Sequence, residues 1–461
     1  MESNTRSNTQ LNYTEVVGAA KAKGGAVVNE LLEMKENTAV TLLTFLTFFV
    51  IILAFLYYFY YSGAGTVGGI AIILIITIML SVVGQAVMGN AGVVAGCIIG
   101  ILLGMTIFRK MASSKNTRNC NVMDNVYGEK NTAISSLSFN GSTSDGQSEL
   151  FPLCYYYIKS AYNCCSGGDY RNDYVSLCGL NDLLKQGVRG LDFEIYSIDD
   201  QPVVATSTVD KYCVKETFNY VKFSDVVTTI ENTAFSETVP NPNDPIIFHL
   251  RIKSENTAMY KNLSKIFDGL NGKGLLMGPS FSYEQTDVAN NTNFGSINIS
   301  KMLGKIILIV DRSNPTCLCK DCSESEDCSN FYEFVNMTSN SPNMQLLRYD
   351  DIQYTQTPDE LILQNSGTMS IGLPNKGSSP DNPSALVMRE MGIQMLAMRY
   401  QKVDANVEEN DFFFNEKGKA FVLKPEGMRP QVVTLKDPPV QDPKLYYNDR
   451  VLKTDYYELK V

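Results

Sequence analysis

The chain has 461 residues and a formal net charge of −10, and both values limit what it can be. This length allows one large domain with appendages, or two to three average domains. The negative charge, without a basic stripe to collect phosphates, argues against a nucleic-acid partner. A single histidine, His249, excludes any mechanism that needs two imidazoles.

The N-terminal part of the chain divides into a polar tail and a long uncharged block. Residues 1–36 carry mixed charge and a weak amphipathic pattern, which indicates a tail. Residues 37–108 form 72 consecutive positions without a charged side chain. This is enough for three crossings of a membrane at about 20 residues each. The pattern predicts transmembrane helices at 39–61, 68–88 and 91–108, and therefore an integral membrane protein.

The third predicted span carries a glycine at every fourth position, namely Gly92, Gly96, Gly100 and Gly104. Small residues at this spacing share one helix face and allow a neighbouring helix to approach closely. The repeat predicts helix packing, either against the other spans or between copies of the chain in a homo-oligomer.

The charges that flank the uncharged block give conflicting signals for its orientation. By the positive-inside rule, the cluster after the last span places that side in the cytosol, and it consists of Arg109, Lys110, Lys115 and Arg118. Three lysines before the first span point the other way. The denser C-terminal cluster favours a cytosolic globular domain. Six N-x-S/T sequons and a cysteine-rich insert favour the opposite side, although an Asn-rich chain also produces sequons by chance.

The rest of the chain is predicted to be a linker, a barrel and a tail. Residues 109–150 form a polar Ser/Asn/Gly linker, and residues 431–461 form the tail. Residues 151–430 alternate strand and helix patterns, as in a single (β/α)₈ TIM-like barrel of the α/β class. Strands are expected at 153–160, 189–196, 245–253, 304–311, 392–401 and 420–425, and helices at 178–187, 223–236 and 255–270.

Two carboxylates, Asp192 and Glu194, lie two residues apart near the end of one predicted strand. This spacing puts both side chains on one face of the strand. The carboxyl ends of the strands are where parallel barrels build their sites. Such a pair can bind a metal ion or act as an acid and a base.

Six pieces of the sequence, in order, resemble the catalytic barrel of the phosphatidylinositol-specific phospholipase C family, in both its X and its Y half. They are "GVRGLDFEIY", "QPVVATST", "FSDVVTTIENTAFS…DPIIFHLRIKSEN", "MLGKIILIVD", "NPSALVMREMGIQMLAMRYQ" and "FFFNEKGKAFVLKPEGMRP". The resemblance covers residues 151–430 and implies a TIM barrel of the phospholipase-C type. In that family two histidines handle protons, and Ca²⁺ held by Asn and three carboxylates neutralises charge in the transition state.

The chain departs from the family pattern at the positions that carry the chemistry. The two family histidines fall on Tyr162 and Thr208, and neither side chain is a base near neutral pH. The phosphate-binding lysines fall on apolar or acidic residues such as Ile309 and Asp311. His249 lies in the middle of a strand, where a structural role is expected.

The metal ligands implied by the resemblance are only partly kept. Asn163 matches the family Asn, whereas Asp192 and Glu194 match its Glu-x-Asp with the two acids exchanged. The fourth ligand position falls on Arg251, whose guanidinium can pair with both carboxylates and replace the cation. The implied site is vestigial, without a cofactor. Ca²⁺ is expected only if the chain is a working hydrolase.

Three hypotheses for the function follow. The first is a membrane-anchored, catalytically inactive phospholipase-C-like barrel that binds a lipid headgroup, a glycan or a protein. The second is a membrane-tethered phosphodiesterase that uses Asp192, Glu194 and Tyr162. The third is a structural envelope or virion membrane protein without a ligand.

Cysteines cluster in an insert at 313–345, where Cys317, Cys319, Cys322 and Cys328 lie in an acidic run. Four thiols can bind Zn²⁺, but the spacing lacks the paired C-x₂-C of common zinc sites. Disulfides in an oxidising compartment are the plainer interpretation. Cys164 and Cys165 lie beside the former active-site turn and are further candidates for pairing.

Overall fold

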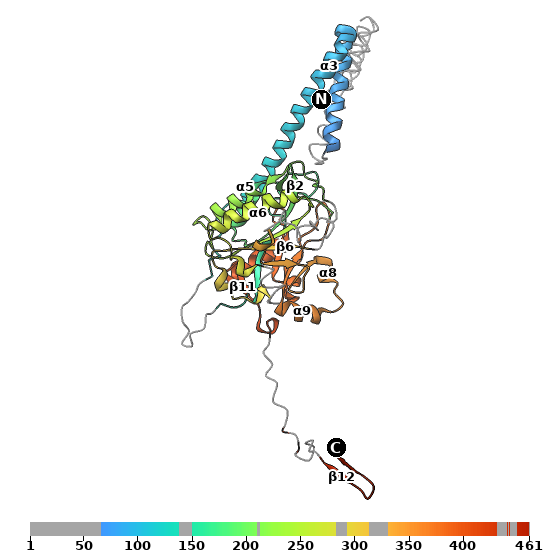
Figure 1. Cartoon of the computed structure of the whole chain (residues 1–461). Helices are drawn as coiled ribbons and strands as arrows, with labels where there is room; N and C mark the ends of the chain where they lie inside the picture. Colours follow the sequence, from blue (N-terminus) through green and yellow to red (C-terminus); the bar gives the residue numbers. More distant parts are fainter. Residues whose placement is uncertain are drawn as a thin grey trace, which may run out of the picture.

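The computed structural model describes residues 66–137, 150–209, 213–282, 293–312, 331–430, 440, 442 and 450–460. A long helical hairpin projects from one end of a barrel of strands and helices (Figure 1). The expected (β/α)₈ barrel is confirmed, because eight parallel strands lie side by side in the order β7-β6-β5-β2-β1-β10-β9-β8. In the described residues no ladder joins β7 to β8, so the barrel is nearly closed.

The eight barrel strands are short, and they are largely buried except for β8, in which four of the five residues are half-buried. Their bounds are β1 Tyr156–Ala161, β2 Gly190–Ile198, β5 Ile246–Ile252, β6 Ile306–Asp311, β7 Met337–Ser339, β8 Met344–Arg348, β9 Met369–Leu373 and β10 Met395–Met398. A parallel sheet that is covered on both faces needs apolar residues in continuous runs, which is why these strands lack a simple polar alternation. Strand β5 shows the division of faces. Its Phe248 packs against Phe193 and Phe223 on the helix side, and residues 247, 249 and 251 therefore point into the barrel.

Helices cover the outside of the barrel, and their apolar stripes face the strands. Their bounds are α4 Leu177–Lys185, α5 Phe223–Thr233, α6 Thr257–Gly272, α7 Phe331–Phe334, α8 Tyr349–Gln353, α9 Pro358–Gly367, α10 Ala385–Glu390 and α11 Ala405–Lys417. Helix α6 begins at its cap Asn256, which accepts a hydrogen bond from the Ala258 N–H, and it buries Met259, Leu263 and Phe267. The helices expected at 178–187, 223–236 and 255–270 are confirmed as α4, α5 and α6 within a few residues.

The remaining strands lie outside the barrel order. The strand expected at 420–425 forms as β11 Phe421–Leu423, but it pairs antiparallel with the start of β1. Strand β3 Gln201–Ala205 folds back antiparallel on β2 and is followed by β4 Val221–Lys222. In the predicted tail, β12 Val451–Lys453 and β13 Glu458–Lys460 pair only with each other.

Helix α3 Thr66–Tyr127 is two helices joined by a break at Gly89, whose φ of 62° suits glycine. The first arm comprises residues 66–88 and the second arm residues 90–127, and together we call them the hairpin. Within the described part of the chain, we find no helix that combines the length and the apolar character needed to cross a bilayer. The spans predicted at 68–88 and 91–108 fall on the two arms and lack that support, and the span predicted at 39–61 lies outside the described residues.

The repeated glycines of the second arm face the first arm. A Cβ added to Gly92 would lie 1.9 Å from the Gly84 carbonyl oxygen, and one added to Gly96 would lie 2.2 Å from the Leu80 carbonyl oxygen. At Gly100 and Gly104 the nearest atoms are also backbone atoms of the first arm, at 2.5 and 2.9 Å. The two backbones therefore touch along a strip that only glycine permits.

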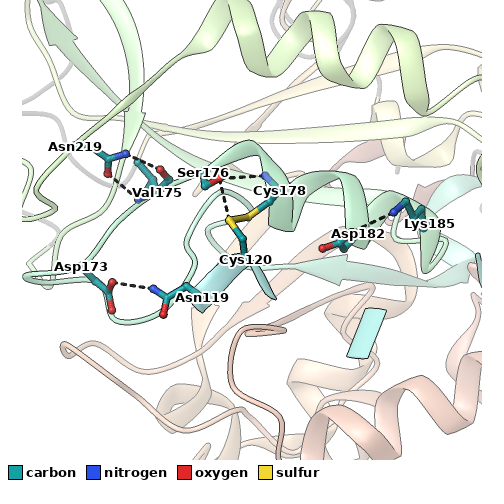
Figure 2. Close-up of a disulfide and its surroundings, with 9 residues drawn as sticks. All are labelled: Asn119, Cys120, Asp173, Val175, Ser176, Cys178, Asp182, Lys185 and Asn219. Atoms are coloured by element: carbon teal, nitrogen blue, oxygen red, sulfur yellow. Dashed lines mark hydrogen bonds and ion pairs between the residues drawn. A yellow bond between two sulfur atoms is a disulfide. The ribbon is translucent and has the colours of Figure 1, made fainter. Parts of the chain in front are cut away.

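The segment expected to be a flexible linker instead continues the helix and packs on the barrel. The second arm runs through residues 109–127 to Tyr127. A disulfide joins Cys120 to Cys178 at the start of α4, and the Asn119 side chain donates a hydrogen bond to Asp173 at 2.9 Å (Figure 2). Composition suggested a linker because residues 109–127 are rich in Ser, Asn and Lys.

Loss of the Cys120–Cys178 disulfide should destabilise the contact between hairpin and barrel. We expect Cys120→Ser to lower the free energy of unfolding by roughly 2–4 kcal/mol, because the bond closes a loop with a sequence separation of 58. Urea unfolding of the full chain in detergent, followed by circular dichroism, measures this loss. Cys97→Ser, at a free cysteine of the hairpin, is the control. An equal loss in both variants would contradict the prediction.

Candidate functional site

Charged side chains gather inside the barrel on the neighbouring strands β2 and β5, next to Asn163, which follows the carboxyl end of β1. The register places Asp192 beside His249 and Glu194 beside Arg251. Because side chains two residues apart share a strand face, all four point toward the barrel axis. This is the end at which parallel barrels build their sites.

The Arg251 guanidinium lies at the centre of this cluster and holds three neighbours. Its Nε and Nη2 donate to the two oxygens of Asp192, at 2.9 and 2.7 Å. Its Nη1 donates to Glu194 Oε1 at 2.7 Å, and Nη2 also donates to Asn163 Oδ1 at 2.8 Å. Asp192 receives a bidentate fork, the strongest geometry for an arginine–carboxylate pair. The structure thus brings together all four residues of the expected vestigial site.

The other oxygen of Glu194 is also occupied. Glu194 Oε2 accepts from the Tyr196 hydroxyl at 2.6 Å and from the Ser207 N–H at 2.9 Å. The Lys253 ammonium lies 3.4 Å from the same oxygen and donates to the Ser207 hydroxyl at 2.8 Å. This carboxylate therefore has two cationic neighbours and no oxygen free of a partner.

His249 completes the network on the other side of Asp192. Its Nδ1 lies 2.7 Å from Asp192 Oδ1, and its Nε2 lies 3.1 Å from the Ser339 hydroxyl. The imidazole is fully buried, with both nitrogens engaged by the protein. Its contacts are those of a structural histidine that helps to hold Asp192.

Burial and ion pairing act in opposite directions on these groups. Burial would raise the pKa of Asp192, but Arg251 and His249 outweigh it and hold this pKa well below its ordinary value. Burial would likewise raise the pKa of Glu194, yet Arg251 and Lys253 lower it. Burial would lower the pKa of Arg251, but the two carboxylates raise it well above its ordinary value. All three groups are charged at neutral pH.

The residues of the site do not fit the Ca²⁺ ion that the family resemblance implies. Calcium needs six to eight oxygen ligands, most of them carboxylate or carbonyl oxygens. Here Asn163 Oδ1, both oxygens of Asp192 and one of Glu194 already accept from the same guanidinium. A cation placed among them would meet the positive charge of Arg251 at contact distance.

The two positions that the resemblance equates with the family histidines make other contacts. The Tyr162 ring lies under the Arg251 guanidinium, 4.6 Å from its centroid, and its hydroxyl accepts from Arg348 at 3.2 Å. The Thr208 hydroxyl donates to Glu216 at 2.6 Å. These contacts hold both side chains in place without offering a base.

The expected phosphate-binding positions also differ from the family pattern. Ile309 is buried within β6. Asp311 accepts hydrogen bonds from Ser339 at 2.9 Å and from Asn340 at 3.2 Å. An acid in this position would repel a phosphate.

Part of the network was not predicted from the sequence. Residues 249 and 251 alternate along β5 and residue 253 continues the pattern just after it, while residues 192, 194 and 196 alternate along β2. Two-residue periodicity could therefore have placed His249, Lys253 and Tyr196 on the same strand faces as the other site residues. Ser207 and Ser339 come from a loop and from β7, and no local pattern marks them.

The cysteine predictions meet a mixed outcome. Cys164 and Cys165 are buried and free, so their expected pairing is wrong. The pair Cys120–Cys178 was not expected, and Cys213 is also disulfide-bonded. The zinc candidates Cys317, Cys319, Cys322 and Cys328 lie outside the described residues.

Comparison with known proteins agrees with this geometry. Residues 150–311 match the family model described as phosphatidylinositol-specific phospholipase C, X domain. No curated protein matches the chain.

Several solved structures are similar to the chain. PLC21 of L. pealei is 17% identical with a TM-score of 0.48, over 63% of this chain and 40% of its own. PLC21 of S. officinalis is 18% identical with a TM-score of 0.48, and the match covers 62% of this chain and 38% of the PLC21 chain. A calcium-dependent phosphoinositol-specific phospholipase C from Pseudomonas sp. is 11% identical with a TM-score of 0.38, and the match covers 64% of this chain and 100% of the bacterial chain. This chain thus spans about two fifths of the two PLC21 proteins.

Removal of the Arg251 charge should destabilise the barrel in a pH-dependent manner. We expect Arg251→Met to cost about 3–5 kcal/mol at about pH 7, because it leaves two buried carboxylates with fewer partners. In the wild type the carboxylate pKa values are lower than in the unfolded chain, so their stabilisation is complete above about pH 5 and is lost as the pH falls through the folded values. In the variant Asp192 can take up a proton, so the loss should shrink toward about pH 5. Urea titrations across this pH range measure both effects.

The matched control is Arg171→Met, which removes a largely exposed arginine that lies 3.5 Å from Glu216. A surface pair of this kind contributes about 1 kcal/mol or less. Equal losses for the two variants, or a loss at Arg251 that does not depend on pH, would contradict the assigned role of the central guanidinium.

Proposed function

We propose that this chain, whose residues 150–311 match the X-domain model of phosphatidylinositol-specific phospholipase C, keeps the family barrel as a catalytically inactive recognition module. One observation supports this most strongly. The guanidinium of Arg251 binds Asp192, Glu194 and Asn163, the residues that the resemblance equates with metal ligands. The guanidinium of Arg251 thus occupies the position that a catalytic Ca²⁺ ion would take in the family.

The available acids and bases support inactivity. Cleavage of an inositol phosphodiester through its own hydroxyl needs a group that removes a proton and one that protonates the leaving group. The only histidine is buried against Asp192 and Ser339. The carboxylates have lowered pKa values, which makes them poor bases at neutral pH.

The barrel mouth nevertheless keeps groups that can bind an anionic ligand. Arg348, at the end of β8, is half-buried and donates to the Tyr162 hydroxyl and to the Pro374 carbonyl oxygen at 2.9 Å. The buried Asn163 Nδ2 has no hydrogen-bond partner among the described residues. An unmet buried donor carries a free-energy cost that an acceptor atom of a ligand would relieve. A phospholipid headgroup supplies such acceptors, and a glycan or a protein are the other ligands to test.

We also infer that the chain is attached to a membrane. The support is the run of 72 uncharged residues and the many large apolar side chains exposed on the hairpin. The Cys120–Cys178 disulfide favours an oxidising compartment for the barrel. This argues against the cytosolic side that the flanking charges favour, so the barrel is proposed to lie on the non-cytosolic side.

We expect the full chain to bind the phosphatidylinositol headgroup without cleaving the lipid. In mixed micelles of phosphatidylinositol and detergent, we expect no release of inositol phosphate with either Ca²⁺ or a chelator. Turnover that disappears in Asp192→Ala would show that the chain is a divergent phosphodiesterase and would contradict the proposal.

Binding is tested by calorimetry with the soluble headgroup glycerophosphoinositol. We expect binding by the wild type and affinity at least about tenfold lower in Arg348→Gln, because a charged hydrogen bond is lost. Arg450→Gln, an exposed arginine in the C-terminal segment, should bind like the wild type. Absence of both turnover and binding would favour a purely structural membrane protein.

A further inference from the structure

The contacts between the hairpin and α4 define the direction in which the hairpin leaves the barrel. Lys115 forms an ion pair at 3.0 Å with Asp173, which lies in the loop between β1 and α4. Five residues further on, Cys120 is bonded to Cys178 in the first turn of α4. At the end of α3, the Tyr127 carbonyl oxygen accepts from Gln186, the C-terminal cap of α4, at 3.1 Å. The second arm and α4 therefore run parallel.

The topology of the barrel shows from which of its two ends the hairpin projects. Helix α4 connects the carboxyl end of β1 with the start of β2, so it runs from the mouth of the barrel to the opposite end. The second arm runs alongside it in the same direction. Residues before Lys115 must then project beyond the rim of the mouth, as Figure 1 shows, on the side opposite to β11 and α9.

The projecting part of the hairpin has a surface that suits a lipid bilayer. Large apolar side chains are exposed on both arms, among them Leu74, Ile78, Val82, Val94, Ile98, Ile99, Leu102, Leu103 and Met105. From Gly89 to the rim contact at Lys115 the helix rises about 39 Å, comparable with the hydrocarbon core of about 30 Å. The uncharged part of the second arm ends directly before Arg109, and arginine or lysine side chains near the end of a membrane helix reach the interface between lipid and water.

We propose that the hairpin inserts into the bilayer and that its fixed attachment to α4 holds the barrel with its mouth facing the headgroup layer. The inference depends on the proposed membrane attachment and adds the orientation. Phe108, the last residue of the uncharged block, lies seven positions before Lys115, which is a rise of about 10 Å. Headgroups therefore lie close to the rim, at the end of the barrel where β1 and β8 end and where Asn163 and Arg348 lie.

The orientation also gives the disulfide a role. Lys115, Asn119 and Cys120 contact the β1–α4 segment on successive turns, and the covalent bond prevents the helix from separating when the polar contacts break. The aromatic contact of Tyr127 with Tyr400, with ring centroids 5.4 Å apart, fixes the lower end of the helix. Two attachment points more than one turn apart define an axis, whereas one would allow the barrel to tilt.

Because the chain contains no tryptophan, single tryptophans can report the position of each part. We would place the full-length variants in liposomes with dansyl-labelled headgroups and measure energy transfer from tryptophan. Ile99→Trp tests the hairpin, Val214→Trp the mouth and Leu363→Trp the opposite end. The native side chains are 57%, 68% and 74% exposed, so the substitutions should be tolerated.

The two barrel positions lie at opposite ends. Val214 lies in the loop whose Glu216 carbonyl oxygen accepts from the Asn172 N–H, beside the rim contact of Lys115. Leu363 lies on α9, whose Asn365 carbonyl oxygen accepts from Gln394 just before β10 begins. We expect strong transfer from Ile99→Trp, clear transfer from Val214→Trp and little from Leu363→Trp.

The possible failures are distinguishable. Absence of transfer from Ile99→Trp would overturn both the membrane attachment and the orientation, and would point to a second copy of the chain as the cover of the hairpin. Transfer from Ile99→Trp together with equal or reversed signals from the barrel positions would overturn the orientation alone.

The disulfide is tested by adding Cys120→Ser and Cys178→Ser to the same variants. We expect the difference between Val214→Trp and Leu363→Trp to decrease at least about twofold as the barrel tilts, with the Ile99→Trp signal unchanged. An unchanged difference would overturn the role given to the disulfide.

Discussion

The buried ion-pair network around Arg251 is the constraint on which the interior of the barrel depends. Two carboxylates within β2 are fully buried, and their desolvation would cost several kcal/mol without a partner. The guanidinium of Arg251 pairs with both carboxylates, because its planar group carries N–H donors that point in several directions. A lysine could not bridge Asp192, Glu194 and Asn163 with four directed hydrogen bonds. The same arrangement that stabilises the fold removes the ligands that a catalytic cation would need.

The stability of the barrel interior and the occupation of the Asp192 and Glu194 oxygens thus depend on one residue, Arg251. A bound metal ion can leave and return, whereas Arg251 is fixed on the neighbouring strand β5 and stays beside the two carboxylates. His249 and Lys253 extend the network, and Tyr162 covers the guanidinium with its ring. The polar groups that remain for a ligand lie farther toward the rim, where Arg348 is half-buried. This arrangement supports binding at the mouth rather than chemistry in the interior.

How far the sequence could predict the structure depends on the range of the interactions. Strands β2, β5 and β6 were predictable because their apolar runs are long, whereas β7 and β9 are too short to stand out. The carboxylate pair and Arg251 could be found because two-residue periodicity fixes their face. The Cys120–Cys178 bond could not, since it joins a segment of linker composition to a helix that lies beside it only in the folded barrel. The contacts of Ser207 and Ser339 depend in the same way on the closure of the barrel.

The central claim is tested most directly by calorimetric titration of the full chain with Ca²⁺, beside the variant Arg251→Glu. In the wild type, the guanidinium occupies the carboxylate oxygens, so the account predicts no binding heat. The variant replaces the cation with a third carboxylate next to Asn163, and it should gain Ca²⁺ binding. Tight Ca²⁺ binding by the wild type would contradict the account, since Arg251 would then have to leave Asp192 and Glu194, and catalysis by this barrel would be open again.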